Sequence, residues 1–249
     1  MRLVTYNIRN ARALDPASWW WRRRRRLADV IDGLHADVVA LQEAYPSQIR
    51  YLRGGPLASS DHELAGRGRN RDGGGEAVPI FTRTSALRRS SEETIWFGPN
   101  PDRPGSRDPG ASHPRIATIA TYDVVGSDGR LRVVNLHLDP ASVDRRTESV
   151  RQLLASVGPV DTMSTVVVGD FNGPLDEPWS AELTAAGFRS ALPADAGPTS
   201  NGFGDPGGQQ QIDHVFVDRT AEVVAAEIVT AAGHASDHYP VLVELSFGT

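Results

Sequence analysis

The feature that most constrains this chain is the kind of residue that follows its short apolar segments. Several of these segments run directly into a carboxylate, an amide or an imidazole: Asn7, Glu43, His137, Asp170, Asn172, Asp213 and His238. In α/β proteins ligands gather where strands end, so these side chains are expected to share one polar pocket. A single acid after a strand is more often a turn former or a helix cap. The repetition of the pattern favours a functional site.

The order of the apolar segments predicts a strand-rich α/β domain with helices interspersed. Strands are expected at residues 3–8, 37–41, 77–81, 116–122, 131–136, 164–168, 213–217 and 241–245, and helices at 22–35, 144–157 and 180–186. Two glycine-rich and proline-rich stretches, 66–75 and 98–114, are expected to be loops. A length of 249 residues fits one domain or two. Because the expected pocket draws on both Asn7 and His238, we expect residues 1–249 to form a single domain.

The composition excludes several classes of protein. No apolar run reaches the ~18 residues that a membrane span needs, so no spanning segment is expected. The net charge of −5 excludes a uniformly basic coat for nucleic acid. The chain has no lysine, which excludes Schiff-base catalysis. No secretory leader is recognisable at the N-terminus, which predicts a cytoplasmic protein, and we expect a monomer.

The chain also contains no cysteine, which removes thiolate metal sites, disulfides and cysteine nucleophiles together. The polar residues at the segment ends instead offer carboxylate and amide oxygens, together with imidazoles. Oxygen donors without thiolates favour a hard cation, so Mg²⁺ or Mn²⁺ is the expected cofactor.

Five short motifs carry a resemblance to a known family. They are Thr5-Tyr6-Asn7, Leu41-Gln42-Glu43, Asn135-Leu136-His137, Gly169-Asp170-Phe171-Asn172 and Ser236-Asp237-His238. In this order they resemble the motifs of the endonuclease/exonuclease/phosphatase (DNase I-like) superfamily, and segments 75–81, 104–106 and 114–118 resemble its bacterial branch. The resemblance implies a four-layer sandwich of two packed mixed β-sheets flanked by helices, with the site at one end of the sheets. It also implies metal-assisted attack of water on a phosphate ester.

The resemblance implies a role for each site residue. Glu43 would be the principal metal ligand, with Asn7 and Asp237 supporting the metal. Residues that would act on the water or the scissile phosphate are Asp170, Asn172, His137 and His238. Asp213 would orient His238, and Glu76 would orient His137. Arg115 would either bind the substrate phosphate or form a salt bridge, and residues 199–203 resemble a loop near the pocket.

The substrate stays open at this stage. An Mg²⁺-dependent phosphoesterase acting on a phosphodiester or phosphomonoester is favoured, a DNA or RNA endonuclease of the same fold is the alternative, and a non-catalytic binding module is less favoured. The aromatic and basic run Trp19–Arg26 could contact nucleic acid, although an ordinary helix start is the favoured interpretation. Relatives often carry Tyr at the positions of Thr82 and His214, and both departures could alter substrate packing. His35, His62, His113 and His234 are expected to be exposed or loop residues.

Overall fold

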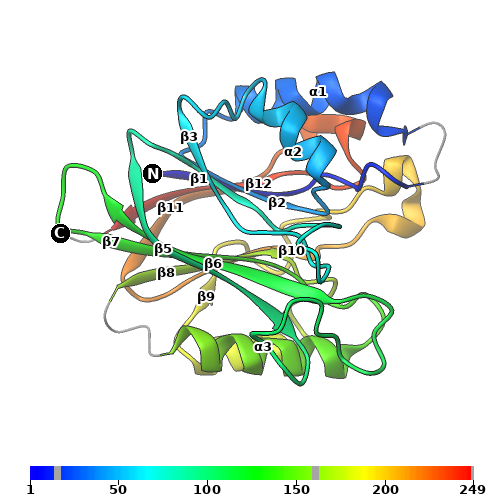
Figure 1. The fold of residues 1–249 in the computed structure, drawn as a ribbon, viewed down its shortest axis with the longest axis vertical. Coiled ribbons are helices and arrows are strands. Elements are labelled where there is room, and N and C mark those ends of the chain that lie inside the picture. Colours follow the sequence, from blue (N-terminus) through cyan, green and yellow to red (C-terminus); the bar gives the residue numbers. More distant parts are fainter. Residues whose placement is uncertain (14–17, 159–162, 248–249) are drawn as a thin grey trace.

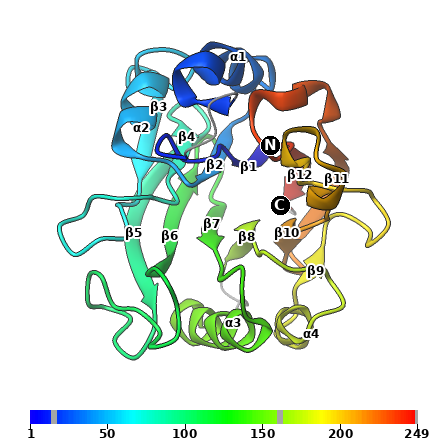
Figure 2. The same cartoon turned by 90° about the vertical axis from the view of Figure 1, so that its right-hand side faces the viewer.

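Two β-sheets pack face to face between two layers of helices (Figure 1). The computed structural model describes residues 1–13, 18–158 and 163–247. Residues 14–17, 159–162 and 248–249 of the expected domain lie outside the described residues. The four-layer sandwich implied by the sequence motifs is confirmed. Figure 2 shows helices α1 and α2 over one sheet and α3 and α4 over the other.

Each sheet has six strands. The first sheet runs in the order β11 (Ala221–Ile228), β12 (Val241–Phe247), β1 (Arg2–Asn7), β2 (Val38–Gln42), β4 (Ile80–Arg83) and β3 (His62–Ala65). The second runs in the order β5 (Leu87–Phe97), β6 (Arg115–Val124), β7 (Arg130–His137), β8 (Ser164–Asp170), β10 (Asp213–Val217) and β9 (Arg189–Ser190). The helices are α1 (Trp20–Gly33), α2 (Pro46–Arg53), α3 (Val143–Val157) and α4 (Pro178–Ala185), with short 3₁₀ helices η2 (Gly202–Gly204), η3 (Pro206–Gly208) and η4 (Thr230–Ala235).

The apolar residues of the central strands face both ways, which explains their nearly continuous hydrophobic sequences. Successive side chains of a strand point to opposite faces of the sheet. In β8, Val166 and Val168 pack into the core between the sheets, while Val167 packs outward among residues of α3 and α4. In β1, Leu3 packs inward and Val4 packs outward against residues of α1. Three apolar layers therefore hold the four layers of backbone together.

The strand pairing brings the predicted polar residues to one end of both sheets. Strands β1 and β2 are parallel, with Asn7 opposite Gln42. Strands β7 and β8 are also parallel, and β10 runs antiparallel to β8, so His137 and Asp213 both lie opposite Asp170. Parallel neighbours end at the same edge of a sheet. The two sheets are joined beneath this edge, where the Gln42 amide donates a 2.6 Å hydrogen bond to Asn135.

The predicted helices and strands are present with ends shifted by at most three residues, and the largest shift is at the start of the strand expected at 77–81. The strand β4 begins only at Ile80, and Ala77 forms isolated bridges with Ala44 and Gly68. Pro79 has no N–H to add to a ladder, so the regular pairing starts after it. Helix α2 and strands β3, β5, β9 and β11 were not predicted. His62, expected to be exposed or in a loop, is buried in β3.

Candidate active site

The side chain of Asp170 lies at the centre of the polar cluster. Its Oδ2 accepts a 2.8 Å hydrogen bond from the amide of Asn7. The same oxygen is 3.5 Å from Nε2 of His137 and 4.0 Å from Nε2 of His238. Burial and the charge of Asp213 raise the pKa of Asp170, whereas the two histidines lower it. Asp170 therefore joins residues from both sheets around one carboxylate.

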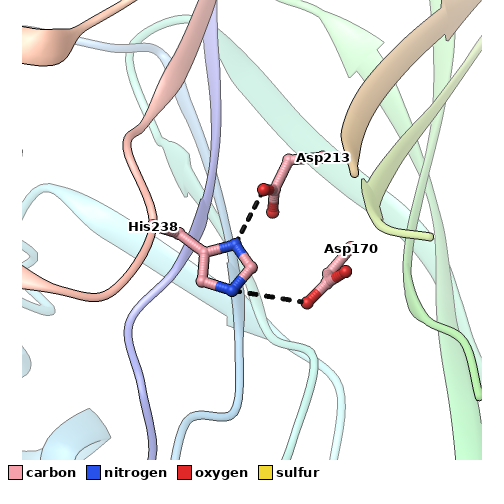
Figure 3. Close-up of side chains that lie close together, drawn as sticks. All are labelled: Asp170, Asp213 and His238. Atoms are coloured by element: carbon pink, nitrogen blue, oxygen red, sulfur yellow. Dashed lines mark hydrogen bonds and ion pairs between the residues drawn. The ribbon is translucent and has the colours of Figure 1, made fainter. Parts of the chain in front are cut away.

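His238 is held by Asp213, as the sequence motifs implied. Its Nδ1 lies 2.7 Å from Oδ2 of Asp213, and its Nε2 faces Asp170 (Figure 3). Burial alone would lower the pKa of His238, but the charge and hydrogen bond of Asp213, together with Asp170 and Asp237, raise it to about 10. At neutral pH this imidazole is therefore positively charged and fixed in orientation.

His137 has the opposite charge state and a different partner from the expected one. Burial, then the charge of Arg115, lowers the pKa of His137 to about 4, so the imidazole is neutral at pH 7. The expected pairing of Glu76 with His137 is not found. The Glu76 carboxylate instead forms a 2.5 Å ion pair with Arg69, and the acid facing His137 is Asp170. The buried guanidinium of Arg69 outcompetes a neutral imidazole for the carboxylate.

Glu43 is a partly exposed carboxylate that remains ionised. Its backbone adopts a left-handed conformation with φ of 60°, an uncommon state for a residue other than glycine. Its Oε2 accepts hydrogen bonds from the backbone and the side chain of Asn10, at 2.8 and 2.9 Å, and its Oε1 faces Asn7 at 3.2 Å. Burial raises the pKa of Glu43, but His137, the Asn10 hydrogen bonds and Arg9 lower it to about 2 overall.

The Asn7 amide connects Glu43 with Asp170. Its Nδ2 donates to both carboxylates, and its Oδ1 accepts a 2.9 Å hydrogen bond from the backbone N–H of Arg9. Asp237 is connected to Asn7 through Arg9. The Oδ2 of Asp237 lies 3.3 Å from the guanidinium of Arg9. The backbone carbonyl of Asp237 accepts from the N–H of Asn201 at 2.6 Å. The 199–203 loop therefore packs directly on the segment that carries Asp237 and His238.

Asn172 stands on a tight turn whose shape depends on Gly169. Gly169 has φ of 145°, and a Cβ at this position would collide with the backbone carbonyl of Leu136. The backbone N–H of Asn172 donates to Oδ1 of Asp170 at 2.9 Å, and its Nδ2 donates to the carbonyl of Leu138 at 3.0 Å. Asn172 itself has φ of 54°. Glu43 and Asn172 are thus both left-handed, and such strain is concentrated at functional sites.

Arg115 is a largely buried cation without an ion pair or a hydrogen bond among the described residues, and its Nε is among the buried atoms that lack a partner. It lines a narrow cavity together with Arg69, Glu76 and His137. Burial and the neighbouring Arg69 lower the pKa of Arg115, while Glu76 and Asp170 raise it. A buried guanidinium costs free energy unless an anion satisfies it.

The ligand atoms of Asp170, Asp213 and His238 lie within 4.8 Å of one another, a spacing that a metal ion could bridge. The charge and hydrogen bond of Asp213 raise the pKa of His238 to about 10, so a metal ion bound here would have to displace the proton of the imidazole. Glu43 itself offers an ionised carboxylate, which is the kind of oxygen ligand that a hard cation prefers.

Two residues that support the site, Arg69 and Asn10, escaped the sequence analysis, and Thr199 was placed near the pocket only as part of the 199–203 loop. Arg69 holds Glu76, and its carbonyl accepts a 2.7 Å hydrogen bond from the indole of Trp96. The Thr199 hydroxyl accepts from the backbone N–H of Asp213 at 2.9 Å. All three act from loops, where no periodicity marks them.

The two departures from the family pattern do not face a substrate. Thr82 is fully buried in β4, opposite Val38 and so toward the end of the first sheet that lies away from Gln42. His214 is fully buried beneath the site, packed against the rings of Phe171, Trp179 and Phe216. Its Nε2 lies 2.9 Å from the carbonyl of Gly173. A direct contact of either side chain with a substrate is therefore not expected, and an effect on substrate packing would have to pass through the residues that cover them.

The aromatic and basic run Trp19–Arg26 at the start of α1 is partly structural. The guanidinium of Arg23 is buried and donates to the backbone carbonyls of Ile8, Arg9 and Ala235. The Trp20 ring packs edge-on against Tyr51 at 5.6 Å. Trp19 and Trp21 are exposed. This agrees with the favoured interpretation of an ordinary helix start.

Comparison with known proteins identifies the class of this fold and site. The model of the endonuclease/exonuclease/phosphatase family matches residues 4–238. The chain belongs to this family, whose members are hydrolases acting on phosphate esters, and it is an enzyme of that class. None of the curated proteins matches the chain.

Several solved structures share the fold over nearly their whole length. An endonuclease/exonuclease/phosphatase from Bacteroides vulgatus is 28% identical, with a TM-score of 0.86 over 99% of this chain and 98% of that chain. The mannosyl-6-phosphatase Bt3783 of Bacteroides thetaiotaomicron VPI-5482 is 23% identical, with a TM-score of 0.86 over 99% and 100%. TDP2 of D. rerio, in complex with a single-strand DNA product, is 17% identical, with a TM-score of 0.73 over 99% and 98%. At identities of 23% and 17%, the last two structures show a similarity of fold alone.

Proposed function

We propose that the protein is an Mg²⁺-dependent phosphoesterase that hydrolyses a phosphomonoester or phosphodiester by attack of water on phosphorus. In this reaction a water oxygen bonds to phosphorus, the ester P–O bond breaks, and the alcohol leaves with a proton. The observation that carries the proposal is the position of Asp170, which faces Asn7, His137 and His238 from within a buried pocket. Such a carboxylate can orient water and accept its proton.

Three side chains are proposed to bind the phosphate. His238 carries a positive charge that Asp213 fixes in place, and Arg115 is a buried guanidinium without a protein anion as partner. Asn172 offers an amide from its left-handed turn. Donors fixed before the reaction stabilise the charge that develops in the transition state.

The proton of the attacking water is proposed to pass to Asp170. Burial raises the pKa of this carboxyl group, which makes it a stronger base than an exposed aspartate. His137, neutral at pH 7, lies 3.5 Å from Asp170 and can share a hydrogen bond with it or with the water. Glu76 is proposed to be a positioning residue. It forms an ion pair with Arg69, which lines the same cavity as Arg115.

Glu43 is proposed to hold the Mg²⁺ ion, with Asp237 as a second carboxylate. Asn7 would support the ion through its hydrogen bond to Glu43. When bound, the ion would neutralise phosphate oxygens as a Lewis acid. The ionised carboxylate of Glu43 and the absence of thiolates support a hard cation, either Mg²⁺ or Mn²⁺.

We also propose that residues 1–249 act as a single domain and as a monomer. The proposed site takes residues from both sheets, from Asn7 at the start to His238 near the end. In the described part of the chain, the helices are too short or too polar to cross a bilayer.

A nuclease is the second candidate, because exposed arginines lie close to the proposed site. A panel of substrates separates the two. The protein is incubated with Mg²⁺ and either supercoiled plasmid, a phosphodiester or a set of sugar phosphates, and nicking and phosphate release are measured. Release from a small ester without nicking supports the small-ester phosphoesterase, nicking supports the endonuclease, and turnover that persists in EDTA would contradict the proposed metal.

A further inference from the structure

A groove lined by arginines lies directly beside the proposed phosphate pocket. The groove has a volume of about 690 Å³ and runs between helix α2 and the glycine-rich 66–75 loop. Arg50 and Arg53 of α2 form one wall, and Arg67 comes from the loop opposite. Ala77 lines both this groove and the narrow cavity that contains Arg115 and His137. The two spaces are therefore adjacent.

The charged side chains that line the groove are all positive. Its described lining contains three arginines and no aspartate or glutamate. Arg50, Arg53 and Arg67 are exposed and have no ion pair among the described residues. In a protein with a net charge of −5, such a concentration of unneutralised arginines at one place attracts anions.

Helix geometry explains only part of this arrangement. The C-terminus of a helix favours basic residues, so Arg50 and Arg53 in the last turn of α2 could serve the helix alone. Arg67 belongs to a different segment, and its guanidinium lies 5.6 Å from the centre of the Trp96 ring. Trp96 is buried and anchored to the carbonyl of Arg69. Arg67 is thus positioned by the same residue that supports the Arg69–Glu76 pair of the site.

The lining of the groove also leaves the backbone accessible. Five of its lining residues are glycines, which have no Cβ to hold a ligand away from the main chain. Gly68 could not carry a side chain, because its Cβ would collide with the backbone of Gly74. A phosphate group can therefore approach both guanidinium groups and backbone here.

We propose that this arginine groove binds a second phosphate group of the substrate, while the scissile phosphate occupies the pocket of His238 and Arg115. This inference rests on the proposed function and narrows it to substrates that carry at least two phosphates. The second phosphate belongs either to the next nucleotide of a single strand or to a small molecule with two phosphate esters. Arg50, Arg53 and Arg67 are binding residues in this proposal and take no part in the chemical step.

The test compares ligands that differ in phosphate number. Calorimetric titration without divalent metal gives Kd for two pairs: fructose 1,6-bisphosphate with fructose 6-phosphate, and a short thymidine oligonucleotide with thymidine 5′-monophosphate. The protein is the wild type, Arg50→Gln/Arg67→Gln, or the control Arg88→Gln/Arg130→Gln, which removes the same charge. Arg88 and Arg130 lie near the ends of β5 and β7 away from Arg115 and His137, roughly 20–30 Å along the strands.

In at least one of the two pairs, we expect the wild type and the control to bind the ligand with two or more phosphates about tenfold more tightly than the ligand with one phosphate. In Arg50→Gln/Arg67→Gln this preference should disappear, since each exposed arginine contributes roughly a two- to fivefold effect. For an oligonucleotide, the slope of log K against log salt should also fall by about 1.4. The pair that shows the preference identifies the source of the second phosphate.

No preference in the wild type for either pair, or a preference that survives in Arg50→Gln/Arg67→Gln, would overturn the proposal. Hydrolysis of para-nitrophenyl phosphate by the same variants with Mg²⁺ tests the proposed function separately. The groove variant should retain that activity, because this ester has one phosphate. Loss of the one-phosphate activity in the groove variant, with the fold intact by circular dichroism, would place the arginines in the catalytic pocket and would also contradict the proposal.

Discussion

Replacing His214 by Gln should remove a specific part of the protein's sensitivity to acid. His214 is buried against three aromatic rings, and burial lowers its pKa from 6.5 to about 4, partly offset by its hydrogen bond to the carbonyl of Gly173. The folded-state pKa lies below the value of the unfolded chain. As the pH falls below about 6.5, the unfolded chain therefore binds a proton that the folded protein does not.

The magnitude follows from the difference in pKa. Between 6.5 and about 4 each pH unit costs about 1.36 kcal/mol, so the His214 contribution to stability falls by about 3 kcal/mol and then levels off. His214→Gln keeps an N–H for the carbonyl of Gly173 but does not titrate. Its stability at pH 7 can differ from the wild type by a constant amount, and this does not affect the pH-dependent difference.

The assay is urea unfolding of both proteins at pH 7, 6, 5 and 4, followed by tryptophan fluorescence. Other buried groups, including His137, titrate equally in both proteins and cancel in the comparison. We expect the wild type to lose about 3 kcal/mol more than His214→Gln over this range. Parallel curves for the two proteins would refute the reasoning that His214 is buried in its neutral form.

Three further predictions concern the site and its support. Gly169→Ala should abolish activity and lower the unfolding temperature, because the new Cβ would collide with the carbonyl of Leu136. A variant that keeps its activity and its melting temperature would show that this contact is not tight. Glu43→Gln should raise the Mg²⁺ concentration needed for half-maximal rate, and an unchanged metal titration would remove Glu43 as ligand. Arg23→Gln should lower the free energy of unfolding by about 3 kcal/mol, since several carbonyls lose a charged donor; a loss below about 1 kcal/mol in urea would show that water replaces the guanidinium.

The fold was predictable where strands are buried on both faces. The central strands β1, β7, β8 and β10 are buried over most of their length, and their apolar runs predicted both their type and their position. The four strands that were not predicted, β3, β5, β9 and β11, are the outer strands of the two sheets. Strand β5 shows the reason: its middle, Ser90–Glu93, is largely exposed and polar, because an edge strand needs little apolar surface.

The site was predictable to the extent that its residues lie at strand ends. Register places Asp213 opposite Asp170 in one sheet and Asn7 opposite Gln42 in the other, and His238 joins them from the segment before β12. Partner choice depends on the shape of a loop that no periodicity marks. Glu76 pairs with Arg69 and not with His137, and only the folded loop shows which cation reaches the carboxylate.

The same limit applies to the loops that support the site. Asn10 binds Glu43 from an irregular segment after β1, and neither residue type nor spacing distinguishes it from other loop asparagines. The arginine groove likewise depends on α2, a short helix that the apolar pattern of the sequence did not reveal.

The central claim is that water, positioned by Asp170, attacks phosphorus in an ester bound by His238. Hydrolysis of para-nitrophenyl phosphate in ¹⁸O-labelled water with Mg²⁺ tests it most directly, using the wild type, Asp170→Asn, His238→Asn and the exposed control His35→Asn. We predict that the label enters the released phosphate, that EDTA stops the reaction, and that the control is fully active. His238→Asn should lose about 10²–10³ in kcat, and Asp170→Asn at least about 10². Label in the nitrophenol, or full activity of Asp170→Asn, would contradict the account.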